Sequence, residues 1–101
     1  MPKLYEYFGL VVYFYANEHE PIHVHGEYQG RESKAEIIMR NGKVINIRFG
    51  KSRKMRPLAG AKLKDFKRLV EFKADDIVNR WVDYFVKKKH NTPEIISHKL
   101  R

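Results

Sequence analysis

The 101-residue chain contains no cysteine, which excludes disulfide bonds, thiolate metal sites and cysteine nucleophiles. It also lacks any apolar run approaching the roughly 20 residues needed to cross a bilayer, and it has no secretory signal pattern at its start. No internal repeat, low-complexity tract or linker rich in Pro, Gly or Ser interrupts it. We therefore expect a cytoplasmic protein without membrane contact, with one domain over residues 1–90 and a C-terminal tail over residues 91–101.

Positive charge is abundant, but only in the second half of the chain. The formal net charge is +9 at pH 7; residues 1–45 hold five Lys and Arg against six Glu, whereas residues 46–101 hold sixteen against six acidic residues. Lys and Arg that neutralise phosphates release condensed counterions, so such an imbalance favours a polyanionic partner. RNA, DNA and an acidic protein all fit this description.

The cations are densest between the last predicted strand and the first predicted helix, with five in the nine residues 48–56. Contacts to phosphates position a protein on a nucleic acid without conferring sequence specificity. The alternative is a solvated loop and helix face that aids solubility. The candidate nucleic-acid-binding residues are Arg48, Lys51, Arg53, Lys54, Arg56, Lys62 and Lys67.

The pattern of apolar residues predicts an α+β fold. Its period changes from near 2 to near 3.6 at about Leu58, which indicates strands first and helices afterwards. Two apolar stripes, from Leu63 to Val70 and from Ile77 to Phe85, indicate two amphipathic helices, and Pro93 suits a further helical turn. The predicted architecture is a four-stranded antiparallel β-meander followed by two C-terminal helices packed on one face. The predicted strands cover residues 8–15, 22–28, 33–40 and 43–49, and residues 50–60 are expected to form a surface loop.

Three of the five histidines, His19, His23 and His25, fall within seven residues. Strand alternation places His23 and His25 on one face, and His19 enters from the preceding turn. Imidazoles with pKa values near 6.5 can divide acid and base roles, as cleavage of RNA through its own 2′-hydroxyl requires. These three histidines are the candidate catalytic residues, and this chemistry needs no metal or other cofactor.

Two other interpretations of the histidines stay open. The same nitrogens could bind zinc or another borderline metal, with Glu18, Glu20 or Glu27 as an oxygen ligand. The rings could instead be structural, with their protons held by backbone carbonyls beside Pro21. A zinc-peptidase helix motif is absent, because Pro21 lies inside the histidine run.

Aromatic residues crowd the first predicted strand. Alternation sends Tyr7, Tyr13 and Tyr15 to the face opposite Phe8 and Phe14. Exposed tyrosines could stack on unpaired bases, although such residues more often fill a small core or an interface.

The sequence resembles a bacterial family over roughly residues 4–88. The run Phe8-Gly9-Leu10, the segment Glu18-His19-Glu20-Pro21-Ile22-His23-Val24-His25 and the late Trp81 are similar to the domain of unknown function 4160. Members of this family resemble the products of small accessory genes that lie beside a gene for a second small protein, in arrangements suggestive of toxin and antitoxin pairs. The resemblance implies a small cognate protein partner and an RNA-contacting or RNA-cleaving surface made of the three histidines and the basic loop. The alternative is a non-enzymatic adaptor or DNA-binding regulator.

Overall fold

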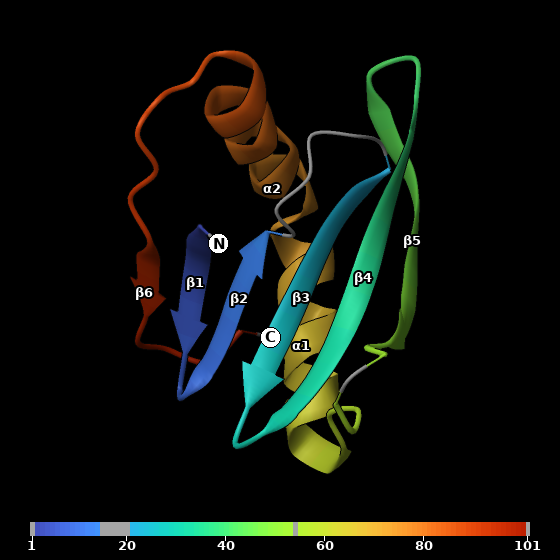
Figure 1. The fold of residues 1–101 in the computed structure, drawn as a ribbon, viewed down its shortest axis with the longest axis vertical. Helices are drawn as coiled ribbons and strands as arrows, with labels where there is room; N and C mark the ends of the chain where they lie inside the picture. The colour runs from blue at the N-terminus through green and yellow to red at the C-terminus, as the bar shows by residue number, and fades with distance from the viewer. Residues whose placement is uncertain (1, 15–20, 54, 101) are drawn as a thin grey trace.

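Short apolar segments from both ends of the chain meet in one six-stranded sheet (Figure 1). The computed structural model describes residues 2–14, 21–53 and 55–100. The strand order is β5-β4-β3-β2-β1-β6; consecutive strands from β1 to β5 are antiparallel, and β6 runs parallel to β1. The strands are β1 (Lys3–Tyr7), β2 (Leu10–Phe14), β3 (Ile22–Tyr28), β4 (Arg31–Arg40), β5 (Lys43–Lys51) and β6 (Glu94–Ile96).

Two helices and a π-helical turn cover one face of the sheet (Figure 1). They are α1 (Gly60–Phe72), α2 (Ala74–Trp81) and η1 (Val82–Val86). Asp75 and Asp76 lie in the first turn of α2, where negative charge favours the positive end of the helix dipole. Within the described residues, no helix is both long and apolar enough to cross a membrane.

The core lies between the sheet and the two helices, with Ile77 of α2 fully buried in it. Alternation on β2 turns Leu10, Val12 and Phe14 inward, and all three are fully buried together with Phe66 of α1. Each such side chain stabilises the fold by about 1.5–3 kcal/mol through its removal from water. At Gly26, a Cβ would lie 2.5 Å from the Phe66 ring, so this position on β3 needs glycine. Among the described residues, no helix lies on the opposite face of the sheet (Figure 1).

The predicted α+β class with two helices on one face is confirmed, but the prediction of four strands is wrong. Phe8 and Gly9 form the β1–β2 turn, with φ values of +46° and +88°, so the first predicted strand begins only at Leu10. A separate strand β1 precedes the turn. The β1–β6 pair is parallel, so the sheet is mixed rather than a pure meander.

The segment described above as a C-terminal tail takes part in the fold. Glu94–Ile96 forms β6 where Pro93 suggested a helical turn. Ile96 and Leu100 are only 3% and 8% exposed, and the Leu100 amide donates a hydrogen bond to the Tyr7 hydroxyl at 3.2 Å. Contacts with β1, almost 90 residues away in sequence, therefore fix the conformation of this segment.

Candidate functional site

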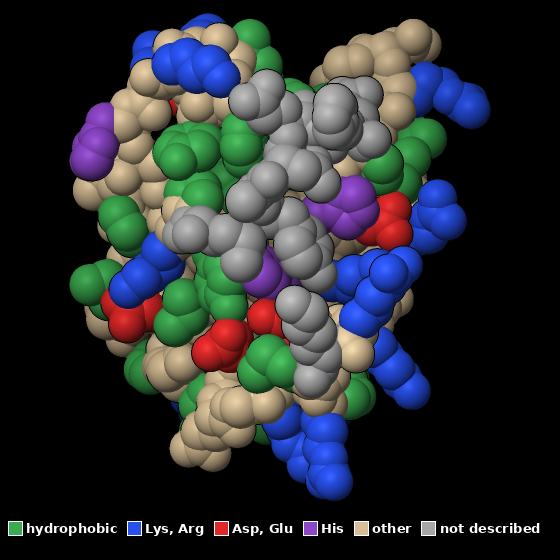
Figure 2. Space-filling model, viewed as in Figure 1, with side chains coloured by type: hydrophobic (Ala, Val, Ile, Leu, Met, Phe, Trp, Pro, Cys, Tyr) green, Lys and Arg blue, Asp and Glu red, His purple; other side chains and the backbone are tan. Residues whose placement is uncertain are grey.

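His23 and His25 lie on the helix-free face of β3. Their neighbours Ile22, Val24 and Gly26 point toward the helices, because Gly26 abuts Phe66 and the other two are buried in the core, and strand alternation then turns both histidines away. Figure 2, which looks onto this face, shows histidine and acidic side chains near its centre. His19 lies outside the described residues.

His25 is held in a closed environment. It is 2% exposed, its Nδ1 lies 3.0 Å from Glu32 Oε2, and its ring centroid lies 3.9 Å from that of Tyr13. Burial lowers the pKa of His25 below its ordinary value, although Glu32 acts in the opposite direction. We therefore expect His25 to be neutral at pH 7.

The Tyr13 hydroxyl joins two carboxylates on the same face. It donates to Glu27 Oε2 at 2.6 Å and lies 3.4 Å from Glu32 Oε2. Glu27 and Glu32 are cross-strand partners, and like charges in such positions repel. Burial, followed by the hydrogen bond to Glu27, raises the pKa of Tyr13, so its hydroxyl remains a donor that relieves this repulsion. Tyr13 is thus a structural bridge.

His23 has a separate environment from His25. Its Nε2 lies 3.7 Å from Glu36 Oε2, and its side chain is 23% exposed. In the described part of the chain, no group of three or more His, Asp or Glu side chains is arranged to hold a metal ion. Of the suggested oxygen ligands, Glu27 accepts the Tyr13 hydrogen bond, whereas Glu18 and Glu20 lie outside the described residues.

The basic cluster follows the edge of the sheet. Arg48 and Lys51 lie on the edge strand β5, and Arg53 and Arg56 lie between β5 and α1. All four are exposed, and among the residues that the structure describes no carboxylate lies within 4.0 Å of their charged groups. Figure 2 shows Lys and Arg side chains gathered on the β4–β5 side of the helix-free face. We call Arg48, Lys51, Arg53 and Arg56 the basic strip.

The other predicted cations differ from the basic strip. Lys54 lies outside the described residues. Lys67 is exposed on α1, with Nζ 5.6 Å from the centroid of the Phe49 ring on β5. Lys62 is committed to internal contacts, because its Nζ donates to the Phe8 carbonyl at 2.8 Å and lies 4.5 Å from the centroid of the Tyr28 ring.

Three hydrogen bonds attach the backbone of the segment between β5 and α1 to the sheet. The Glu32 amide donates to the Arg56 carbonyl at 2.8 Å, and Arg31 Nη1 donates to the Pro57 carbonyl at 3.2 Å. The Leu58 amide donates to the Ser33 hydroxyl at 3.0 Å. The predicted surface loop is thus anchored at its C-terminal end, and Arg56 has a defined position.

A family model described as a domain of unknown function (DUF4160) matches residues 9–82. The chain belongs to this family. The match confirms the resemblance seen in the sequence, and it spans the strands from β2 to β5 as well as α1 and α2. Searches of the curated proteins and of the solved structures found no match to the chain.

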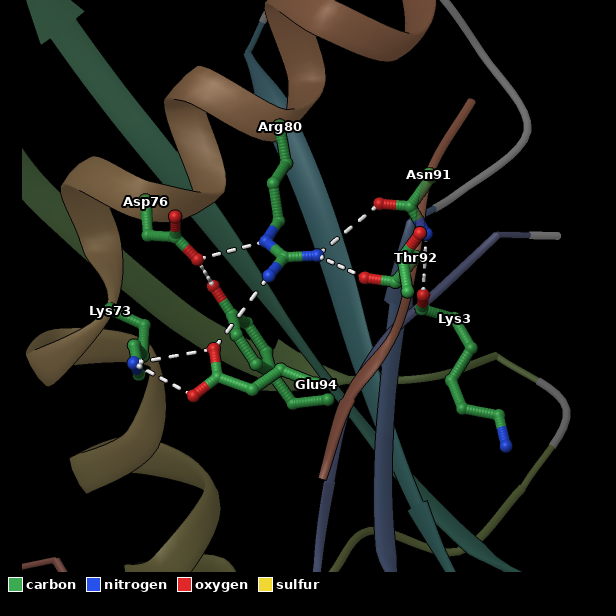
Figure 3. A network of polar contacts seen from close by, with 8 residues as sticks. Lys3, Lys73, Asp76, Arg80, Asn91, Thr92 and Glu94 are labelled. Atoms are coloured by element: carbon green, nitrogen blue, oxygen red, sulfur yellow. Dashed lines mark hydrogen bonds and ion pairs between the residues drawn. The ribbon is translucent and has the colours of Figure 1, made fainter. Parts of the chain in front are cut away.

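A second polar cluster in this DUF4160 protein had no predicted role. Asp76 accepts hydrogen bonds from the Tyr5 hydroxyl and, at 2.9 Å, from Arg80 Nε (Figure 3). Glu94 of β6 lies 3.6 Å from Arg80 and 3.4 Å from Lys73. We call Tyr5, Lys73, Asp76, Arg80 and Glu94 the closing network.

The closing network connects the C-terminal segment to the rest of the fold. Arg80 Nη1 donates to the Thr92 carbonyl at 2.8 Å, and Asn91 Nδ2 donates to the Lys3 carbonyl at 2.7 Å (Figure 3). Burial would raise the pKa of Asp76, but the hydrogen bonds from Tyr5 and Arg80 outweigh it and lower the pKa. Asp76 is therefore an ionised structural acceptor. Its i,i+4 spacing from Arg80 is visible in the sequence, but its contact with Tyr5, 71 residues away, is not.

Proposed function

We propose that this DUF4160 protein binds the phosphate backbone of RNA through the basic strip. The observation that supports this proposal is that, within the described residues, no carboxylate lies within 4.0 Å of the charged groups of these four exposed cations. Arg48 lies opposite Glu36 in the β4–β5 ladder but forms no ion pair with it. A cation without a carboxylate partner gives up no ion pair when it contacts a phosphate, and each such contact releases counterions. Lys67 extends this surface onto α1.

Lys62 is left out of the proposed binding surface. Its ammonium group already contacts the Phe8 carbonyl, the Tyr28 ring and, at 4.0 Å, Asp65. A phosphate contact at Lys62 would have to compete with these interactions. The proposal therefore narrows the predicted set of cations to those that face solvent.

Cleavage of RNA by His19, His23 and His25 stays a prediction and does not enter the proposal. A general base must come within hydrogen-bond distance of the proton that it removes. His25 is 2% exposed beside Glu32 and Tyr13, so RNA could reach it only if this environment opened. The toxin–antitoxin association and the small cognate protein partner likewise stay predictions.

The test is RNA binding as a function of salt. Fluorescence anisotropy with a labelled RNA should show affinity that falls steeply with salt. Replacing the four strip residues by Ser should reduce the slope of log affinity against log salt by about 0.7 for each lost phosphate contact to a single strand. Equal affinity for DNA of the same sequence would extend the partner class to both nucleic acids.

A charge-matched control separates a binding surface from a general effect of net charge. The control variant replaces four exposed lysines outside the strip by Ser and lowers the net charge equally. Its salt slope should stay close to that of the wild-type protein. The proposal fails if the wild-type protein binds no RNA at low salt, or if the strip variant and the control lose affinity equally. The control positions are Lys3, Lys87, Lys89 and Lys99.

A further inference from the structure

Phe8 is an exposed aromatic residue at the tip of the β1–β2 turn. It is 51% exposed and has φ of +46°, a left-handed conformation that non-glycine residues rarely adopt. Gly9 follows with φ of +88°, and a Cβ there would lie 3.0 Å from the Tyr28 ring. Strained residues of this kind persist where the surroundings hold them and are found preferentially at functional sites.

Contacts on two sides hold Phe8 in this exposed position. The Tyr7 and Phe8 rings meet edge to face, with centroids 4.9 Å apart and an interplanar angle of 79°. Lys62 Nζ donates to the Phe8 carbonyl at 2.8 Å. The turn is thus fixed by β1 on one side and by α1 on the other, and the ring is presented to solvent without packing into the core.

Cations of the neighbouring turn lie at the same end of the sheet. Lys62 contacts both the Phe8 carbonyl and the Tyr28 ring. Tyr28 pairs with Arg31 across the β3–β4 turn, and the backbone of Arg31 forms an isolated parallel β-bridge with that of Arg56. Figure 1 shows the β1–β2 turn, the β3–β4 turn and the start of α1 together at this end. The Lys62 contacts and these backbone pairings therefore connect the turn that carries Phe8 to Arg56 of the basic strip.

We propose that the RNA is single-stranded and that one of its unpaired bases stacks on Phe8 while the adjoining backbone contacts Arg31 and Arg56. This inference rests on the proposed function and adds two residues to it. Surfaces that bind single strands combine aromatic rings with a cationic track, because every base has a stacking face. In a duplex that face is covered by neighbouring bases, so Phe8 discriminates against paired RNA.

The position of Phe8 distinguishes it from the other exposed phenylalanine. Phe72 is 61% exposed at the C-terminal end of α1. The adjacent cation, Lys73, is already engaged with Glu94. Phe72 lies at the end of α1 opposite the segment that holds Arg56, so it is exposed but distant from the basic strip, and it serves as a matched control.

The experiment measures the affinity of a labelled ten-nucleotide RNA, as a single strand and as a duplex, by anisotropy at constant low salt. Phe8→Leu keeps apolar bulk but removes the aromatic face, so it should weaken single-strand binding about tenfold and duplex binding less than twofold. Its salt slope should equal that of the wild-type protein, because no charge is lost. Phe8→Trp should retain the affinity for the single strand, and Phe72→Leu should change the affinity for neither the single strand nor the duplex.

A spectroscopic measurement keeps the test independent of any folding defect in Phe8→Leu. The fluorescence of Phe8→Trp, corrected for the Trp81 signal of the wild-type protein, should be quenched by the single strand and not by the duplex. Unchanged emission at saturation, or wild-type affinity in a folded Phe8→Leu variant, would overturn the stacking inference while leaving the basic-strip proposal in place. Failure of the wild-type protein to bind any RNA would instead overturn the proposed function.

Discussion

The closing network and the basic strip use positive charge in opposite ways. In the closing network, Arg80 is paired with Asp76 and Lys73 is paired with Glu94. In the basic strip, Arg53 and the other three cations have no carboxylate within 4.0 Å among the described residues. Charge that holds the chain together is neutralised within the fold, whereas charge left unneutralised is available to a partner.

The difference follows from what each region must hold in place. β6 has only three residues, so its ladder to β1 supplies few hydrogen bonds and little apolar burial. Polar contacts from α2 supplement that ladder, since hydrogen bonds to charged groups contribute about 1.5–3 kcal/mol each. β5 has nine residues and an antiparallel partner along its length. Its cations are therefore not needed for anchoring.

The largest effect is expected when the closing network is broken at Arg80. Arg80→Ala removes the donors to Asp76 and to the Thr92 carbonyl and leaves Asp76 and Glu94 close to each other without their shared cation. We expect a loss of about 2–3 kcal/mol in the free energy of unfolding, and a melting temperature lower by about 10 °C. Urea unfolding and thermal melts measure both quantities.

Lys87→Ala is the control for the Arg80 variant. Lys87 and Asp83 are an exposed i,i+4 pair 4.0 Å apart, and such pairs contribute about 0.3–0.5 kcal/mol. RNA affinity should change little in either variant. If Arg80→Ala were as stable as Lys87→Ala, the closing network would not hold the C-terminal segment, and the contrast with the basic strip would disappear.

Local sequence patterns predicted the parts of the fold that depend on neighbouring residues. The alternation from Ile22 to Tyr28 is enough to place His23 and His25 on one face, because strand geometry alone determines that result. The apolar spacing from Leu63 to Val70 likewise identifies α1. The number of strands was not predictable in this way. β6 becomes a strand by pairing with β1 across almost the whole chain, and β1 is separated from β2 by the positive-φ turn at Phe8 and Gly9.

The candidate site shows the same division between local and distant information. The density of cations in residues 48–56 is visible in the sequence. That no described carboxylate lies within 4.0 Å of the four cations of the basic strip is a property of the folded surface. The sequence cannot show that Lys62 donates to Phe8, 54 residues away, and so it included Lys62 among the phosphate-binding residues. Nor can it show that Glu32 and Tyr13 enclose His25.

Lowering the pH is expected to have a smaller effect on stability. The effect should arise at His25, which belongs neither to the closing network nor to the basic strip. Burial lowers the pKa of His25, against the opposing effects of Glu32 and Glu27. In the unfolded chain His25 therefore takes up a proton near pH 6.5, whereas in the folded protein it is protonated only at a lower pH. The free energy of unfolding should fall as the pH drops below about 6.5 and level off below the folded pKa.

Urea unfolding at pH 7.5 and 5.5 measures this dependence. His25→Asn should lower the free energy of unfolding at pH 7.5 by about 1–3 kcal/mol, because it leaves polar partners unsatisfied. Its free energy of unfolding should also depend less on pH than that of the wild-type protein. His23→Asn is the matched control and should keep the wild-type dependence, because His23 lies in a separate environment beside Glu36 and its side chain is 23% exposed. The same pH dependence in the wild-type protein and in His25→Asn would mean that His25 is not the responsible group.

The smallest effects are expected from single substitutions of two cations, Lys62 on α1 and Arg53 of the basic strip. Lys62→Met keeps the aliphatic stem but removes the ammonium that contacts Phe8 and Tyr28, so we expect a loss of about 1 kcal/mol in the free energy of unfolding. Arg53→Ser removes an exposed charge without an acidic partner and should change stability by less than about 0.5 kcal/mol. RNA affinity should show the reverse order, because Arg53 is available to a phosphate while Lys62 is held by the fold. A stability loss at Arg53 equal to that at Lys62, or a greater loss of RNA affinity in Lys62→Met, would show that internal contacts do not decide which cations serve binding.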